Sequence, residues 1–193
     1  MSKEKRNLRK TIKRESRELV KQNRWNLVLG DLLVSTSAST SYVVVGMVFG
    51  GPLTFGLTDY SLKTIRNERR NTGTLFKGFS KNFGKTVGLY FLEFIYLLLW
   101  FLLFIIPGII KSFSYSMAFY ILADNPELGP KEAITKSREM MKGHKWELFV
   151  LYLSYIGWIF LSILTFGLLA IFFVGPWTYL AAAKFYQTIK DKN

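Results

Sequence analysis

The chain has 193 residues, half of them hydrophobic, with a positive mean hydropathy of +0.19 and a formal net charge of +13. It contains no cysteine and one histidine, His144, which excludes disulfides, thiolate chemistry and a histidine-rich metal cluster, so we expect no metal and no cofactor. Basic residues beside long apolar runs indicate an anionic membrane surface as the partner, and we expect no nucleic acid.

Residues 1–24 carry ten Lys and Arg residues and predict a basic juxtamembrane helix. Its thin apolar stripe, formed by Leu8, Ile12 and Leu19, is expected to lie on anionic lipid. Because the first apolar run begins only near Trp25, after this charged region, we expect no cleavable signal peptide.

Residues 25–60 are apolar at both ends and rich in Ser and Thr at positions 35–41. This pattern predicts a first hairpin of two short membrane crossings, with the polar stretch at its turn. The alternative is a single crossing over 42–57, preceded by an interfacial helix. Residues 61–85 follow as a basic loop.

Residues 86–123 predict a second hairpin. A helix needs about 20 apolar residues to span a bilayer, and Thr86–Ile106 meets this length with Glu93 as its only charged residue. A Pro-Gly step at 107–108 separates this run from a shorter one, Ile109–Ala123, which forms the second limb.

Four residues of this hairpin form a speculative intramembrane polar site: Glu93, Lys111, Tyr115 and Ser116. An ionisable group inside a crossing is costly, so it is a functional hypothesis by default. Glu93 is interpreted either as a proton or cation site or as a neutral carboxyl, hydrogen-bonded to Tyr115, Ser116 or Tyr120 of the facing helix. Lys111 is expected near the outer face, where its amine reaches lipid phosphate or an anionic substrate.

Residues 124–145 predict an amphipathic loop helix, in which Pro130 suits the first turn and Gly143 the end. The preceding sequence, Asp124-Asn125-Pro126-Glu127, is typical of an exposed turn, although paired carboxylates also perform acid–base chemistry. The apolar face of the helix, which we expect to lie on lipid, consists of Ala133, Ile134, Ser137, Met140 and Met141.

Residues 146–189 predict a third hairpin. The uncharged stretch Leu148–Ala183 contains 36 residues, which is too long for one crossing and suits two. We expect the turn between them at 165–167.

The basic residues predict the topology. Of the 26 Lys and Arg residues, 25 lie in residues 1–24, 59–85, 124–147 and the tail after Ala183, and only Lys111 lies elsewhere. Because Lys and Arg accumulate in cytoplasmic loops, each hairpin is expected to leave the cytoplasm and return. The sequence therefore predicts an all-α polytopic bundle of six crossings, a single integral membrane domain over 1–193 in the cytoplasmic membrane, with both termini inside.

The first and third hairpins look like copies of one another. The segment 20–29 (VKQNRWNLVL) aligns with 141–150 (MKGHKWELFV), and Gly51-Pro52-Leu53-Thr54-Phe55 matches Gly175-Pro176-Trp177-Thr178-Tyr179. Thr64-Ile65 follows the first Gly-Pro pair at the same distance as Thr188-Ile189 follows the second. Internal repeats are common in membrane proteins that enclose a site at the repeat interface, but they also arise by duplication without a transport role.

Two further segments carry a resemblance to a known family. Ile105–Pro126 (IIPGIIKSFSYSMAFYILADNP) and Ala133–Trp158, with KSREMMKG and KWELF, resemble a bacterial membrane-protein family known as domain of unknown function 975, over roughly residues 73–189. The resemblance implies a multi-pass inner-membrane protein. It also implies a distant similarity to the membrane domain attached to some glycerophosphodiester phosphodiesterases, whose catalytic domain has no counterpart here. It brings no active-site motif.

No nucleophile–base pair and no metal cluster is visible in the sequence, so we do not expect an enzyme. We expect a protein that acts through lipids, a membrane partner or a second copy of itself, as an accessory, envelope or self-immunity protein. The alternative is a small transporter or channel for a solute, lipid or peptide, built on the repeats, with Glu93 and Lys111 in its path.

Overall fold

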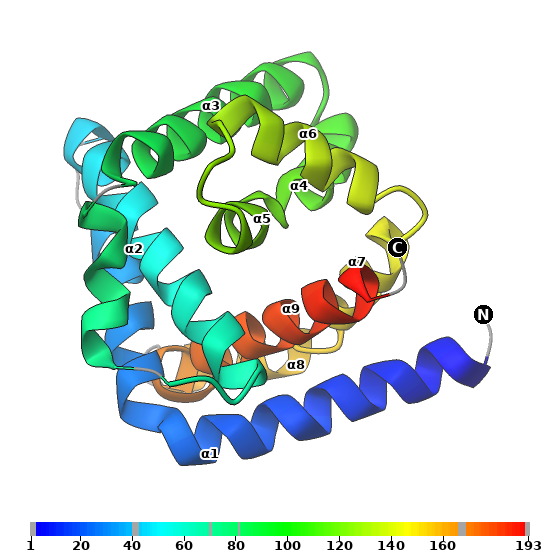
Figure 1. The fold of residues 1–193 in the computed structure, drawn as a ribbon. Coiled ribbons are helices and arrows are strands. Elements are labelled where there is room, and N and C mark those ends of the chain that lie inside the picture. The colour runs from blue at the N-terminus through cyan, green and yellow to red at the C-terminus, as the bar shows by residue number, and fades with distance from the viewer. Residues whose placement is uncertain (1–2, 40–42, 70, 81, 166–168, 192–193) are drawn as a thin grey trace.

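The structure is a computed structural model that describes residues 3–39, 43–69, 71–80, 82–165 and 169–191 (Figure 1). Its helical segments, in chain order, are α1 (Lys3–Ser39), α2 (Val43–Ile65), η1 (Thr72–Phe79), α3 (Phe83–Leu103), α4 (Ile105–Tyr115), α5 (Ala118–Asp124), α6 (Pro130–Met140), α7 (Lys145–Leu153), α8 (Ile156–Leu164), η2 (Ala170–Val174) and α9 (Gly175–Lys190). Here η1 is a 3₁₀ helix and η2 a π-helix. No strand occurs in these ranges, so the predicted all-α fold is confirmed.

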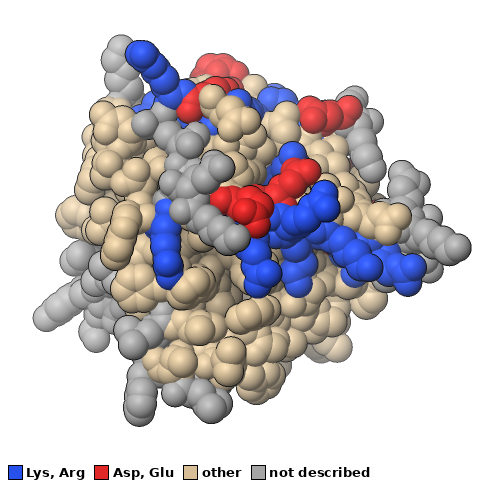
Figure 2. All heavy atoms as spheres, turned by 90° about the horizontal axis from the view of Figure 1, so that it is seen from below, with Lys and Arg blue, Asp and Glu red and all other residues tan. Residues whose placement is uncertain are grey.

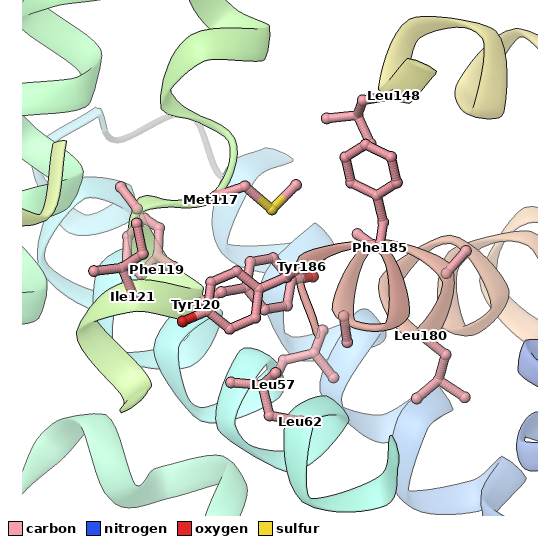
Figure 3. Packing of buried hydrophobic residues seen from close by; sticks show 14 of the residues in the cluster. Leu57, Leu62, Met117, Phe119, Tyr120, Ile121, Leu148, Leu180, Phe185 and Tyr186 are labelled. Atoms are coloured by element: carbon pink, nitrogen blue, oxygen red, sulfur yellow. The ribbon is translucent and has the colours of Figure 1, made fainter. Parts of the chain in front are cut away.

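The core joins all three predicted hairpins. In Figure 1, α1 lies along the bottom, α3, α4 and α6 lie at the top, and α2, α5 and α9 lie between them. Tyr120 of α5 stacks on Tyr186 of α9 with ring centroids 5.6 Å apart, and the buried Leu57 of α2 and Leu180 of α9 lie close by (Figure 3). Burial of such large side chains is the main favourable term in packing these helices together.

Within the described ranges, two segments are long and apolar enough to cross a membrane: Phe83–Leu103 and Ile105–Asp124, the latter comprising α4 and α5. The junction between α3 and α4 leaves apolar side chains uncovered, with Leu102 81%, Phe104 71% and Ile106 72% exposed. A contiguous apolar surface of this kind marks contact with a membrane or a partner. The other four predicted crossings stay a prediction.

The first region forms two helices, as both the predicted hairpin and its alternative require, and which of them cross the membrane stays a prediction. Helix α1 continues through Trp25 and the Ser/Thr stretch to Ser39, and α2 packs beside it. With 37 residues, α1 is about 55 Å long at 1.5 Å per residue. The predicted turn falls partly at 40–42, outside the described residues.

The apolar stripe of the N-terminal segment faces the protein and not lipid, which corrects the expectation from sequence. Ile12 is 1% exposed, and Leu8 and Leu19 pack against the same core. The exposed basic side chains of α1 cover its outer face, and Figure 2 shows charged residues gathered on the side of the molecule where α1 lies, beside a broad uncharged area.

The loop helix is confirmed as α6, but its apolar face is also buried in protein. The Gly129 N–H donates to Glu132 Oε2 at 2.9 Å at the start of α6, and Gly143 beyond its end has φ +80°. Helix α6 fills the break between α4 and α5, because Ser137 Oγ donates to Ser114 O at 2.8 Å and accepts from the Met117 N–H at 3.2 Å. The bundle itself therefore takes the place of lipid on this face.

Candidate functional site

The structure distributes the four predicted site residues over three places. Glu93 lies on α3 with Oε1 buried, and no group among the described residues bonds to that oxygen. The expected bonds from the facing helix are not formed: Ser116 Oγ donates to Phe113 O at 2.9 Å, and the Tyr120 hydroxyl donates to Tyr179 O at 3.3 Å. Tyr115 packs instead against the Tyr96 ring, with centroids 6.1 Å apart.

Lys111 lies beside the loop helix and not apart from it at an outer face. Its Nζ sits 4.4 Å from the centre of the Trp100 ring, and it shares a cavity of about 280 Å³ with Tyr115 and with Lys131 and Arg138 of α6. The prediction that Lys111 and the loop helix lie on opposite sides of the bundle is therefore wrong, because α6 packs against α3 and α4. Ser116 lines a different cavity, together with Asp31 of α1.

A cavity of about 440 Å³ lies between α1 and the last third of the chain. We call it the arginine cavity. Its lining consists of Arg17, Val20, Arg24, Trp158, Leu169, Phe173 and Trp177. The three α1 residues are spaced i, i+3 and i+7, which places them on one face of the helix. The cavity is thus apolar over most of its wall and carries two guanidinium groups.

Aromatic rings hold these guanidinium groups in place. Arg17 lies 4.8 Å from the centre of the Trp177 ring, and Arg24 lies 4.2 Å from that of Phe173. Such cation–π contacts contribute about 0.5–1 kcal/mol each at exposed sites. A planar guanidinium stacked on a ring keeps its N–H groups at the edge, where they remain free to bind an anion.

The neighbouring turn of α1 is fixed by hydrogen bonds to the same cluster. The indole Nε1–H of Trp177 donates to Lys13 O at 3.2 Å, and Lys13 Nζ donates to Ser154 O at 3.2 Å. Burial, and to a smaller extent the charge of Arg17, lower the pKa of Lys13 below its ordinary value. The α1 helix is therefore docked on the aromatic cluster in one register, with Arg17 and Arg24 at the cavity.

The described wall of the arginine cavity carries positive charge and no carboxylate. No carboxylate is among its described lining residues, and no acidic partner of Arg17 or Arg24 occurs in the part of the chain that the structure describes. Two unpaired guanidinium groups close to an apolar volume favour a ligand with an anionic head and an apolar body. The charge of residues 1–24 predicts a general basic surface and does not single out this pair, although the i, i+7 spacing of Arg17 and Arg24 is visible in the sequence.

Asp124 is not the exposed carboxylate that the turn motif predicts. Its side chain is 6% exposed and accepts from Arg66 Nη1 at 2.7 Å, Lys190 Nζ at 2.6 Å and the Tyr186 hydroxyl at 3.0 Å. The bonds to Asp124 raise the pKa of the Arg66 guanidinium, although burial opposes this. These contacts join the ends of α2, α5 and α9, so Asp124 has a structural role in which its oxygens are occupied.

Comparison with known proteins finds one family model that matches part of the chain. A family model described as "Protein of unknown function (DUF975)" matches residues 101–193, the part that runs from the end of α3 to the C-terminus. No curated protein and no solved structure matches the chain. The similarity to the membrane domain of glycerophosphodiester phosphodiesterases stays a prediction.

Proposed function

We propose that this chain, which belongs to the DUF975 family through residues 101–193, is a multi-pass protein of the bacterial cytoplasmic membrane that binds an anionic phospholipid in the arginine cavity. The observation that carries the proposal is the pair of ring-stacked guanidinium groups, Arg17 and Arg24, at the edge of an apolar volume. A lipid phosphate accepts hydrogen bonds from such forks, and acyl chains fit the apolar wall.

The membrane topology is part of this proposal. Three hairpins with both termini in the cytoplasm put 25 of the 26 basic side chains on the side where anionic lipid attracts them. The remaining one, Lys111, lies beside Lys131 and Arg138 of that group and therefore closer to this side than the sequence predicts. The uncovered apolar surface around Leu102, Phe104 and Ile106 supports lipid contact along α3 and α4.

In this proposal the protein acts by binding and not by catalysis. A protein that holds an anionic lipid at the inner surface suits an accessory, envelope or self-immunity role against membrane-active cationic peptides, which target the same lipids. Deletion of the gene is then expected to raise sensitivity to such peptides. Unchanged sensitivity would remove support for this role while leaving lipid binding itself to be judged by the binding experiment.

Lipid binding can be measured by titrating phosphatidylglycerol or phosphatidylcholine into the detergent-solubilised protein and counting bound lipids by native mass spectrometry. The double variant Arg17→Gln/Arg24→Gln is expected to bind phosphatidylglycerol at least about tenfold more weakly, since each tenfold step corresponds to about 1.4 kcal/mol. The matched control is Arg6→Gln/Lys10→Gln, which removes the same charge from exposed positions of α1 outside the cavity. Equal weakening in both double variants would mean diffuse attraction to charge and would contradict a defined site.

A small transporter or channel is the second candidate function. The observation that favours it is the polar cavity that Ser116 shares with Asp31 and with helices of both repeats. Uptake of a solute into liposomes that contain the purified protein tests this candidate.

A further inference from the structure

The second cavity lies where the two sequence repeats meet. It has a volume of about 320 Å³ and is lined from α1, α2, α5, α7 and α9. Extending the 20–29/141–150 alignment by two residues without a gap pairs Asp31 with Tyr152, and the Gly-Pro alignment pairs Thr54 with Thr178 and Thr58 with Ala182. All six of these residues line the cavity, so both copies contribute equivalent positions to one space.

Asp31 is the one ionisable acid or base among the described lining residues apart from tyrosines. It is 7% exposed, and no hydrogen bond or ion pair to its carboxylate occurs among the residues that the structure describes. A buried carboxylate without a partner costs several kcal/mol as an order of magnitude. Native structures keep such a group where a ligand or a proton neutralises it.

A glycine on the facing helix leaves space for this carboxylate in the cavity. Gly175 packs against Asp31 so closely that a Cβ atom at position 175 would overlap the Asp31 carboxylate oxygens. The missing side chain therefore provides the space for the acid, and this glycine is the first residue of the Gly-Pro pair in the third hairpin. An orphan acid that resulted from chance burial would not require a glycine opposite it.

The remaining wall favours an organic cation over a bare metal ion. Phe119, Tyr120, Tyr152 and Tyr179 supply aromatic rings, and ring faces attract ammonium groups. No cluster of three His, Cys, Asp or Glu residues occurs in the described part of the chain, so a multivalent metal lacks ligands here. Tyr152 and Tyr179 also bring hydroxyl groups, whose oxygens can accept an N–H.

We infer that this cavity is a binding site for a small primary ammonium compound, with Asp31 as the counter-ion and the tyrosine and phenylalanine rings around the apolar body. The site does not depend on the arginine cavity, which binds the opposite charge. If the protein is a transporter, the inference adds that its solute is an ammonium compound.

Benzylammonium is a suitable probe because it combines a primary ammonium with a compact ring, and benzyl alcohol is its neutral counterpart. Calorimetric titration of the protein in lipid nanodiscs is expected to show binding of benzylammonium and none of benzyl alcohol. Asp31→Asn is expected to weaken benzylammonium binding at least about tenfold, as loss of a direct charge pair exceeds 1.4 kcal/mol. The matched control, Glu127→Gln, removes an exposed carboxylate outside the cavity and is expected to bind like the wild type.

The melting temperature of the unliganded protein gives a second readout. Asp31→Asn is expected to raise it, because the substitution removes an unpaired buried charge and keeps the shape. A lower melting temperature would show that Asp31 has a structural partner and would overturn the inference. Equal binding by wild type and Asp31→Asn, equal binding of the alcohol, or heat from sodium or potassium chloride alone would overturn it as well.

Gly175→Ala tests the same site without removing the charge. It is expected to displace the carboxylate and to weaken benzylammonium binding, while phosphatidylglycerol binding persists. If Gly175→Ala binds the ammonium normally, Asp31 is not the counter-ion. The Arg17→Gln/Arg24→Gln variant is expected to keep its ammonium binding, which separates this inference from the proposed lipid site.

Discussion

The first and third hairpins share a sequence pattern but differ in how their first limbs are built. Helix α1 runs unbroken from Lys3 to Ser39, whereas the corresponding limb of the third hairpin is divided into α7 and α8 with a break at Ser154 and Tyr155. Tyr155 next to the break packs edge-on against Trp177, with ring centroids 5.2 Å apart. The break therefore builds the aromatic cluster on which α1 docks.

The two cavities reflect this difference. The cavity that contains Asp31, here called the ammonium cavity, is lined by equivalent positions of both copies. The arginine cavity pairs the basic helix of one copy with Trp177 of the other, which stands where the first copy has Leu53. The two copies thus share an interior, and they differ at the position of Trp177, whose ring contacts Arg17. Four substitutions test how far the copies remain equivalent.

The largest expected effect is at Asp124, which binds equivalent residues of both copies. Arg66 and Lys190 occupy the same position after the two Gly-Pro pairs, and both donate to this one carboxylate. Asp124→Ala leaves the Arg66 guanidinium with Gln187 but without a carboxylate partner. We therefore expect a loss of about 3–5 kcal/mol in the free energy of unfolding, measured by denaturant titration in mixed micelles. Glu127→Ala, an exposed control on the same turn, is expected to change it by less than about 0.5 kcal/mol. Similar values for the two variants would show that the contacts of Asp124 with Arg66 and Lys190 do not stabilise the fold.

We expect a loss of stability of intermediate size at the two equivalent glycines, and a larger one at Gly51 than at Gly175. A Cβ at Gly51 would lie 2.5 Å from the Thr86 carbonyl oxygen, which is backbone, whereas a Cβ at Gly175 would meet the Asp31 side chain, which can rotate. We expect Gly51→Ala to cost about 1–3 kcal/mol of stability and Gly175→Ala clearly less. The same denaturant titration measures both. The reverse order would mean that the glycine of the third hairpin serves packing and not the carboxylate.

The smallest effect is expected at Trp177. Replacement by Phe removes the indole N–H that donates to Lys13 O and weakens the contact with Arg17, so we expect a loss of about 1 kcal/mol in stability. Phosphatidylglycerol binding should weaken only a few-fold, because the apolar wall remains. A loss as large as that of Arg17→Gln/Arg24→Gln would shift the main role in lipid binding from the guanidinium groups to the indole.

Local sequence signals predicted local structure well. Pro130 and Gly143 bracket α6, and the long apolar run after Thr86 is α3, because turn chemistry and helix length are encoded within a few residues. Periodicity shows that a helix has an apolar face but not what covers it. For this reason the stripes of Ile12 and Ala133 were expected on lipid and are found against protein.

The candidate sites depend on contacts between distant segments, which the sequence does not display. Glu93 was prominent because it interrupts an apolar run, yet no described group bonds to its buried oxygen. Asp31 was less conspicuous because its run is weaker, and its importance arises only from Gly175, which follows it by more than a hundred residues. The repeat did point to the interface between the copies, but not to the residues that line it.

The unbroken helix α1 fixes the positions of the two cavities relative to each other. Arg17, Arg24 and Asp31 are spaced seven residues apart, so they lie on one face of α1. Arg24 in the arginine cavity and Asp31 in the ammonium cavity are about 10 Å apart along the helix axis. A rotation of α1 that moved Arg17 and Arg24 away from their aromatic rings would also move the Asp31 carboxylate out of its cavity. The hydrogen bonds of Lys13 with Trp177 and Ser154 oppose such a rotation, so each site keeps its geometry when the other is empty.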